Sequence, residues 1–155
     1  MTGANGELSF DHVGIIAPDI DAGCVNLRGL LGPLLLTRRF DDFGLGVSVQ
    51  FCRDISGMVY ELIAPLGARS PVAATLASGM NLLNHVAYRT RSLEAATKRL
   101  HRQHWATPAG PAAAALAFGG ARVQFMLARQ GFLLELIETD RVVHEFGPAE
   151  AHLQA

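Results

Sequence analysis

The sequence contains Val49-Gln50-Phe51 and, further along the chain, Val123-Gln124-Phe125. Eleven positions after each of these glutamines stands a glutamate in an apolar run, as Tyr60-Glu61-Leu62-Ile63 and again as Leu134-Glu135-Leu136-Ile137. Upstream, Asp11-His12-Val13 is echoed by Asn84-His85-Val86. The chain is therefore one unit repeated at an interval of about 73 or 74 residues.

Each repeat divides into the same order of elements. A short β-rich run comes first, over residues 12–17 or 85–89, and an amphipathic helix follows, with Asp19 or Ser92 as its N-cap. Three further strands complete each repeat, expected over 34–40, 47–53 and 58–64 and over 112–118, 122–128 and 132–138. The pattern predicts an α+β protein with two tandem βαβββ modules.

The length predicts a single domain. A chain of 155 residues is close to the usual size of one domain, with one hydrophobic core. We expect module one at about 9–67, a connector at about 68–80, module two at about 81–138 and a tail at 139–155. The connector reads as a short helix that begins at Ser70-Pro71 and ends at Gly79, and no function is assigned to the tail.

Composition and charge exclude several classes of partner. Half of the residues are hydrophobic, 17% are charged and the net charge is −1, so we expect neither nucleic acid nor a membrane as a partner. The N-terminal residues lack the basic and apolar segments of a signal peptide. The spacing of Cys24 and Cys52 matches neither a disulfide framework nor a thiolate metal site. This favours the reducing cytoplasm as the compartment of the protein.

Four repeated residues form a candidate metal site. Glu61 and Glu135 stand in the middle of apolar strands, where glutamate is rarely buried without a compensating partner. His12 and His85 obey the same repeat. Two neutral imidazoles and two carboxylates suit Zn, Ni, Co, Mn or Fe, so we expect one divalent ion per chain, bound by His12, Glu61, His85 and Glu135.

Other polar residues are weaker candidates. Gln50 and Gln124 either line the same cavity as substrate-binding residues or hydrogen-bond within the sheet, and the sequence favours neither alternative. Glu138 is expected to be a solvated charge at a strand end, because it lies three positions after Glu135 and so on the opposite strand face. Surface or tail positions without a functional role are expected for the remaining histidines: His101, His104, His144 and His152.

The duplicated pattern with its two histidines and two glutamates resembles the vicinal oxygen chelate superfamily, also called the glyoxalase, bleomycin-resistance and dioxygenase fold, over residues 9–138. Several segments are most similar to methylmalonyl-CoA epimerases. They are Asp11-His12-Val13-Gly14-Ile15, Gly46-Val47-Ser48-Val49, Glu61-Leu62-Ile63-Ala64-Pro65-Leu66-Gly67, Ser70-Pro71-Val72 and Asn84-His85-Val86-Ala87-Tyr88.

The resemblance implies one open, curved mixed sheet around a metal-binding cleft, with the same four residues as ligands. It also implies chemistry: a metal that binds vicinal substrate oxygens stabilises the enolate formed when a neighbouring proton leaves. Glu135, or Glu61 from the opposite side, is then the group that takes the proton. Family members are commonly dimers, so we expect a homodimer that acts on a small-molecule substrate.

The sequence also departs from the epimerase pattern. The additional glutamate on the strand before the second ligand is replaced by Val49 or Gln50, and the histidine-proline-lysine segment before the last ligand strand is absent. Contacts to a coenzyme A pyrophosphate would then have to come from arginines such as Arg69, Arg89 or Arg129.

Three functions stay open at this point. The first is an epimerase-like isomerase that acts on a small acyl thioester. The second is a lyase of the glyoxalase I kind that acts on a hemithioacetal. The third is a drug-binding protein of the bleomycin-resistance type without chemistry. An extradiol dioxygenase is disfavoured, because that chemistry uses a three-ligand iron site with open positions.

Overall fold

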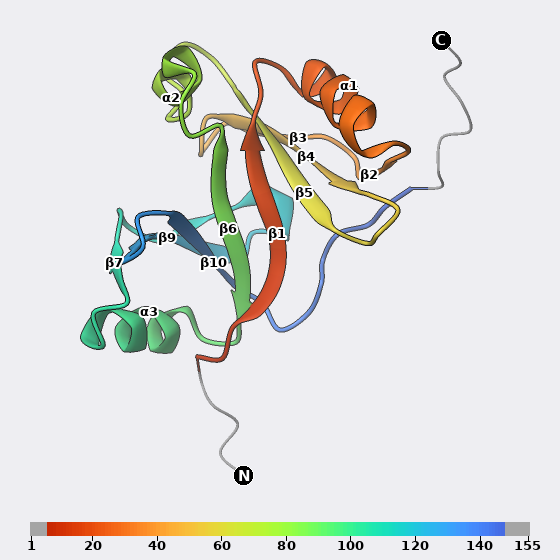
Figure 1. The fold of residues 1–155 in the computed structure, drawn as a ribbon. Coiled ribbons are helices and arrows are strands. Elements are labelled where there is room, and N and C mark those ends of the chain that lie inside the picture. Colours follow the sequence, from red (N-terminus) through yellow and green to blue (C-terminus); the bar gives the residue numbers. More distant parts are fainter. Residues whose placement is uncertain (1–5, 148–155) are drawn as a thin grey trace. The chain divides into compact units, whose positions relative to one another are not determined.

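The computed structural model describes residues 6–147, and Figure 1 shows their fold. Ten strands hydrogen-bond into one mixed sheet in the order β2-β4-β5-β1-β6-β10-β9-β7, with β3 paired to β4 and β8 paired to β9. The strands combine with three α-helices among the described residues. The predicted α+β class with one mixed sheet is confirmed.

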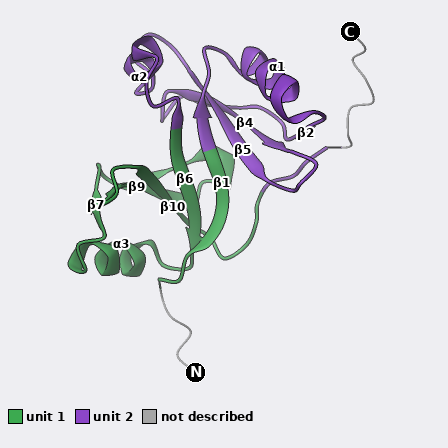
Figure 2. Cartoon of the chain, viewed as in Figure 1, with its two compact units in different colours: residues 1–13, 84–143 green, residues 14–83, 144–155 purple. Residues whose placement is uncertain are grey.

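The chain forms two compact units, coloured separately in Figure 2. Unit 1 contains residues 1–13 and 84–143, and unit 2 contains residues 14–83 and 144–155. The first strand, β1 (Ser9–Ile16), begins in unit 1 and ends in unit 2. The units therefore differ from the two sequence modules, since unit 1 combines the start of module one with most of module two.

Unit 2 is built on the antiparallel pair β4 (Val47–Arg53) and β5 (Val59–Pro65). The short strands β2 (Leu35–Leu36) and β3 (Phe40–Asp42) pair with β4. Helix α1 (Ile20–Leu31) begins at the predicted N-cap, because the Asp19 carboxylate accepts a hydrogen bond from the amide of Ala22. Its apolar stripe packs on the two central strands through a buried cluster that contains Ile20, Cys24, Leu27, Leu34, Cys52, Leu62 and Ala64.

This packing brings the two thiols into one core cluster, although 28 positions separate them in the sequence. Cys24 is 5% exposed, Cys52 is fully buried, and both are free thiols.

Unit 1 repeats the arrangement. Strand β10 (Leu133–Glu138) runs parallel to β6 (Leu83–Thr90) and antiparallel to β9 (Arg122–Ala128), which also pairs with β7 (Ala106–Pro108) and β8 (Ala113–Ala114). Helix α3 (Leu93–Arg102) begins at Ser92, as predicted. Its buried face meets the sheet in a second cluster that contains Leu93, Ala96, Leu100, Ala106, Met126, Leu134 and Leu136.

Three sequence predictions about local structure were wrong. The strand expected over 34–40 is reduced to β2, and β3 begins only at Phe40. The strand expected over 112–118 is reduced to β8 and a 3-10 turn at Leu116–Phe118, which is closed by hydrogen bonds from the Phe118 and Gly120 amides to the Ala115 carbonyl. Helix α2 (Ala73–Ser78) begins later than Ser70, whose carbonyl accepts a turn hydrogen bond from the Ala73 amide.

Candidate metal centre

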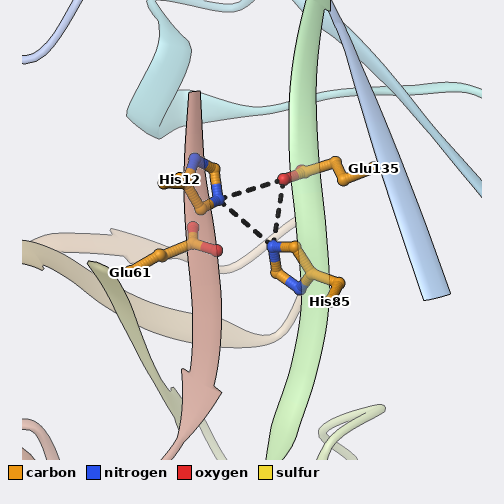
Figure 3. A group of neighbouring side chains, drawn as sticks. All are labelled: His12, Glu61, His85 and Glu135. Atoms are coloured by element: carbon orange, nitrogen blue, oxygen red, sulfur yellow. Dashed lines mark hydrogen bonds and ion pairs between the residues drawn. The ribbon is translucent and has the colours of Figure 1, made fainter. Parts of the chain in front are cut away.

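Two histidines from different sequence repeats face each other in unit 1. His12 lies on β1 and is fully buried, and His85 lies on β6 and is 3% exposed. Their Nε2 atoms lie 3.2 Å apart, as Figure 3 shows. The strands β1 and β6 are neighbours in the sheet, and each holds its imidazole on one sheet face.

The carboxylate of Glu135 completes a triangle with these two rings. Its residue pairs with Ala87 in the parallel register of β10 and β6, two positions after His85 and therefore on the same face. Glu135 Oε2 lies 3.3 Å from Nε2 of His12 and 3.2 Å from Nε2 of His85. The Glu135 side chain is 5% exposed, and its Oε2 atom makes no hydrogen bond among the described residues.

The Nδ1 atom of each ring contacts the side chain of the residue that precedes that histidine. Asp11 Oδ2 accepts a hydrogen bond from Nδ1 of His12 at 2.7 Å, and Asn84 Oδ1 lies 3.0 Å from Nδ1 of His85. With the proton on Nδ1, a neutral imidazole presents a lone pair at Nε2. Three acceptor atoms, two nitrogens and a carboxylate oxygen, therefore converge in a buried space.

This donor set fits a divalent metal ion. Three converging lone pairs repel one another unless a proton or a metal cation lies between them. Metal–ligand bonds of 2.0–2.2 Å at octahedral or tetrahedral angles place neighbouring donor atoms about 3.0–3.4 Å apart, as observed for this triangle. Histidine nitrogen with carboxylate oxygen is a common ligand set for first-row ions.

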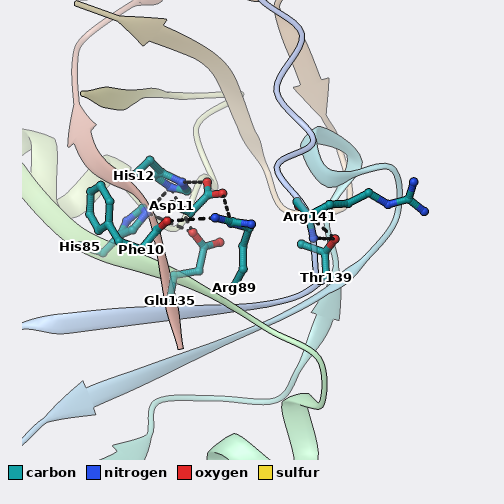
Figure 4. A network of polar contacts seen from close by, with 8 residues as sticks. All are labelled: Phe10, Asp11, His12, His85, Arg89, Glu135, Thr139 and Arg141. Carbon is teal, nitrogen blue, oxygen red and sulfur yellow. Dashed lines mark hydrogen bonds and ion pairs between the residues drawn. The ribbon is translucent and has the colours of Figure 1, made fainter. Parts of the chain in front are cut away.

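Asp11 and Arg89 form an ion pair next to His12, as Figure 4 shows. Arg89 Nε lies 3.0 Å from Oδ1 of Asp11, and its terminal nitrogen donates to the carbonyl of Phe10 at 3.3 Å. The side chains of Asp11 and Arg89 are 2% and 15% exposed. Arg89, considered from sequence for a pyrophosphate contact, is thus engaged with a buried carboxylate.

Two aromatic rings pack against the histidines of the triangle within unit 1. The ring of Phe118 stacks on His12 with centroids 6.0 Å apart, and Phe125 meets His85 edge to face at 5.5 Å. Sequence reasoning did not select Asp11, Asn84 or Phe118, and it considered Arg89 only for a pyrophosphate contact. The repeated Asp-His and Asn-His dipeptides were the available signal for the first two of these.

Glu61, the fourth predicted ligand, belongs to unit 2. It lies in the middle of β5, is 5% exposed and is paired with Phe51 across β4. Burial of a glutamate in a strand agrees with the sequence argument that its charge requires compensation. Its role as a ligand stays a prediction, as do the roles of the other three residues.

The two glutamines lie on the helix-covered face of the sheet in their units. Gln124 Nε2 donates to the carbonyls of Gly110 and Phe125 at 2.6 and 2.8 Å, and its side chain lines a groove between α3 and β9. Gln50 Nε2 donates to the carbonyl of Thr37 at 2.6 Å. Since strand side chains alternate, Gln124 and Glu135 sit on opposite faces, and both glutamine side chains donate to backbone carbonyls.

The remaining candidates take structural positions. Glu138 forms an ion pair with Arg122 at 2.7 Å instead of facing solvent alone. His101 and His104 lie at the exposed C-terminal end of α3. The ring of His144, in the tail, lies 4.0 Å from the ring of Phe51 within unit 2, while His152 falls outside the described residues. Among the described helices, none is long and apolar enough to cross a membrane.

Solved structures with the same fold include methylmalonyl-CoA epimerases. The enzyme from Mycobacterium tuberculosis is 24% identical with a TM-score of 0.69, over 91% of this chain and 93% of that chain. A Streptomyces coelicolor variant in complex with 2-nitronate-propionyl-CoA is 21% identical with a TM-score of 0.69, over 87% and 100%. An epimerase in complex with methylmalonyl-CoA and NH4+ is 22% identical with a TM-score of 0.70, over 87% and 96%.

The sequence comparisons assign the family. No curated protein matches the chain significantly. The family profile described as Glyoxalase/Bleomycin resistance protein/Dioxygenase superfamily matches residues 11–125, which include both histidines and Glu61. The match covers most of the chain, and the fold agrees with it. The protein therefore belongs to the glyoxalase/bleomycin resistance protein/dioxygenase superfamily.

Proposed function

We propose that this protein is a metal-dependent isomerase that moves a proton next to the carbonyl of a small acyl thioester, in the manner of an epimerase. The observation that carries the proposal is the buried triangle of His12, His85 and Glu135, in which three acceptor atoms lie 3.2–3.3 Å apart. Glu61 is the fourth ligand in this proposal. The donor set suits Co, Ni, Mn, Zn or Fe.

The chain's own residues have separate tasks in the proposed reaction. A bound divalent ion supplies Lewis acidity, which lowers the energy of an enolate. Glu135 or Glu61 takes the proton at its carboxylate, and the other glutamate returns it. Phe118 and Phe125 exclude water from the rings of His12 and His85 and so strengthen electrostatic interactions there.

Ligands of the structural relatives support a substrate class. Two of them hold coenzyme A thioesters or their analogues: methylmalonyl-CoA and 2-nitronate-propionyl-CoA. We therefore propose a small acyl-CoA as the substrate. The alternatives, hemithioacetal isomerisation and drug binding without chemistry, are outcomes of the same test.

The test combines metal content with proton exchange. Elemental analysis after incubation with Co, Ni, Mn, Zn or Fe salts should find about one ion per chain in the wild type. The loaded protein should exchange the C2 proton of methylmalonyl-CoA with deuterium from solvent. Glu135→Gln should abolish the exchange, while the matched variant Glu138→Gln, three positions along the same strand, should retain it.

Other results would redirect or reject the proposal. Metal binding with turnover of a hemithioacetal, and none of the acyl-CoA, would make the protein a lyase of the glyoxalase I kind. No metal binding by the folded wild type would reject the enzyme, and drug-binding screens would then follow.

We also propose a homodimer in the cytoplasm. Trp105 and Leu127 of unit 1 are 51% and 52% exposed, which is apolar surface that a second copy could cover. The two free, buried thiols suit a reducing compartment. Light scattering on a size-exclusion column measures the mass, and a mass of one chain would contradict the dimer.

A further inference from the structure

Unit 1 has a groove on the sheet face that α3 covers. The groove lies between α3 and β9, has a volume of about 360 Å³, and is lined by residues that include Leu93, Lys98 and Gln124. We propose that it binds a small hydroxylated carboxylate, with the carboxylate at Lys98 and the hydroxyl at Gln124. Since Gln124 and Glu135 lie on opposite sheet faces, this site is separate from the triangle.

Gln124 supplies a fixed hydrogen-bond acceptor in the groove. The residue is 7% exposed, and its Nε2 donates to the carbonyls of Gly110 and Phe125 at 2.6 and 2.8 Å. These two acceptors use both protons of the amide nitrogen and so fix the orientation of the amide. The Oε1 atom accepts no hydrogen bond within residues 6–147, which leaves it for a donor outside the chain.

The hydroxyl of Thr97 is a second polar group of this lining without a partner. Its Oγ1 atom is buried and makes no hydrogen bond in the part of the chain that the structure describes. Buried polar atoms in native proteins are nearly always hydrogen-bonded, so an exception points to a bound water or ligand. A ligand hydroxyl suits both groups, because it donates to Gln124 and accepts from Thr97.

The charges around the groove favour an anion. Its lining contains Lys98 and Arg122 against one carboxylate, that of Glu94. Arg122 is paired with Glu138 at 2.7 Å, whereas Lys98 forms no ion pair with the described residues. Two further arginines of α3 border Lys98 in a neighbouring groove and make the local potential more positive. Lys98 is therefore the cation available to a carboxylate.

The first experiment changes the ligand by one group. 3-Hydroxybutyrate and butyrate have the same charge and differ by one hydroxyl. Each acid is titrated into the metal-free, ¹⁵N-labelled wild type, and its Kd is taken from the shifts of the amide signals of Leu93, Lys98 and Gln124. 3-Hydroxybutyrate should bind about 2- to 10-fold more tightly than butyrate, as expected for one added hydrogen bond between neutral groups.

The second experiment changes the protein. Lys98→Gln should weaken binding of 3-hydroxybutyrate by about 2- to 5-fold, as expected for loss of an exposed ion pair. Arg102→Gln is the matched control, because it removes the same charge one turn along α3, in the neighbouring groove, and should leave the affinity nearly unchanged. Thr97→Val keeps the shape of the side chain without its hydroxyl and should reduce the preference for 3-hydroxybutyrate over butyrate.

Four results would overturn the inference. They are the absence of saturable shifts at the three amides, equal affinity for the two acids, equal affinity in Lys98→Gln and the wild type, and an unchanged preference in Thr97→Val. Saturable shifts at His85 and Glu135 instead would place the acid at the triangle and would also overturn it. The titrations use metal-free protein, so failure of the proposed metal site would leave their outcome valid.

Discussion

Nε2 of His12 and Nε2 of His85 lie 3.2 Å apart, although 73 positions separate the two residues in the sequence. Glu135 Oε2 lies 3.2–3.3 Å from both nitrogens, so three potential ligand atoms converge. We expect a divalent cation bound there to stabilise the folded state. The first two predictions concern this triangle and its support.

Divalent metal should raise the melting temperature of the wild type. A ligand that binds only the folded state at 100 times its Kd adds about 2.7 kcal/mol to the free energy of unfolding. His85→Ala removes one corner of the triangle and should lose most of this shift, as measured by calorimetry with and without Co²⁺. His101→Ala is the matched control, and an equal shift in His85→Ala and the wild type would contradict the site.

Arg89→Met should destabilise the protein. The variant removes the guanidinium that lies 3.0 Å from the buried Asp11 carboxylate, and loss of one partner of a buried ion pair costs about 3–5 kcal/mol. Urea unfolding gives the free energy. Arg122→Met is the control, since Arg122 pairs with Glu138 near the surface and its side chain is 59% exposed. Similar losses in the two variants would show that burial of Asp11 does not matter.

The thiol of Cys24 should ionise near neutral pH. A hydrogen bond from the Cys52 thiol lowers the pKa of Cys24 to about 7, against the opposing effect of burial, while the pKa of Cys52 is raised. Because the pKa of Cys24 is lower in the folded state, its thiolate contributes stability above the unfolded pKa, and this stability is lost as the pH falls through about 7.

Thiolate absorbance near 240 nm against pH measures this ionisation. Cys52→Ala removes the donor and should raise the pKa of Cys24, whereas Cys24→Ala should remove the transition near pH 7 altogether. A transition that survives in Cys24→Ala would assign the ionisation to a different group.

Gln124→Ala should affect stability and spare metal binding. The Gln124 amide donates to the carbonyls of Gly110 and Phe125, and loss of these hydrogen bonds should cost about 1–3 kcal/mol. Because Gln124 lies on the opposite sheet face from Glu135, Co²⁺ affinity should equal that of the wild type. Weaker Co²⁺ binding in folded Gln124→Ala would contradict this prediction and show that Gln124 affects the metal site.

The repeat in the sequence was sufficient to predict the class of fold. Its spacing predicts the strands that carry Glu61 and Glu135 and both helix starts, since Asp19 and Ser92 cap their helices as expected. It could not predict that the run 34–40 divides into β2 and the start of β3, or that β8 ends at Ala114, where a turn closed on the Ala115 carbonyl begins. Local patterns do not show where an extended run ends for backbone reasons.

The site was predictable in its ligands and not in its support. Residue chemistry and the repeat select His12, His85 and Glu135, which the structure brings together in unit 1. Arg89 could not be selected, because its partner Asp11 is 78 positions away and only the pairing of strands in unit 1 brings them into contact. The sheet face of each glutamine could not be predicted. Side-chain alternation counted back from Glu135 along its strand does not continue across the turn to the preceding strand.

Unit 1 takes its two histidines from different sequence repeats, since residues 1–13 belong with residues 84–143. A half-length ancestor with a single repeat could not have closed the triangle within one chain. Two copies would have had to exchange their first strands, as in a domain-swapped pair. In the present chain the connector at 68–80 joins the two repeats covalently, so the same arrangement forms within one chain. Fragments cut there should bind Co²⁺ only after they recombine.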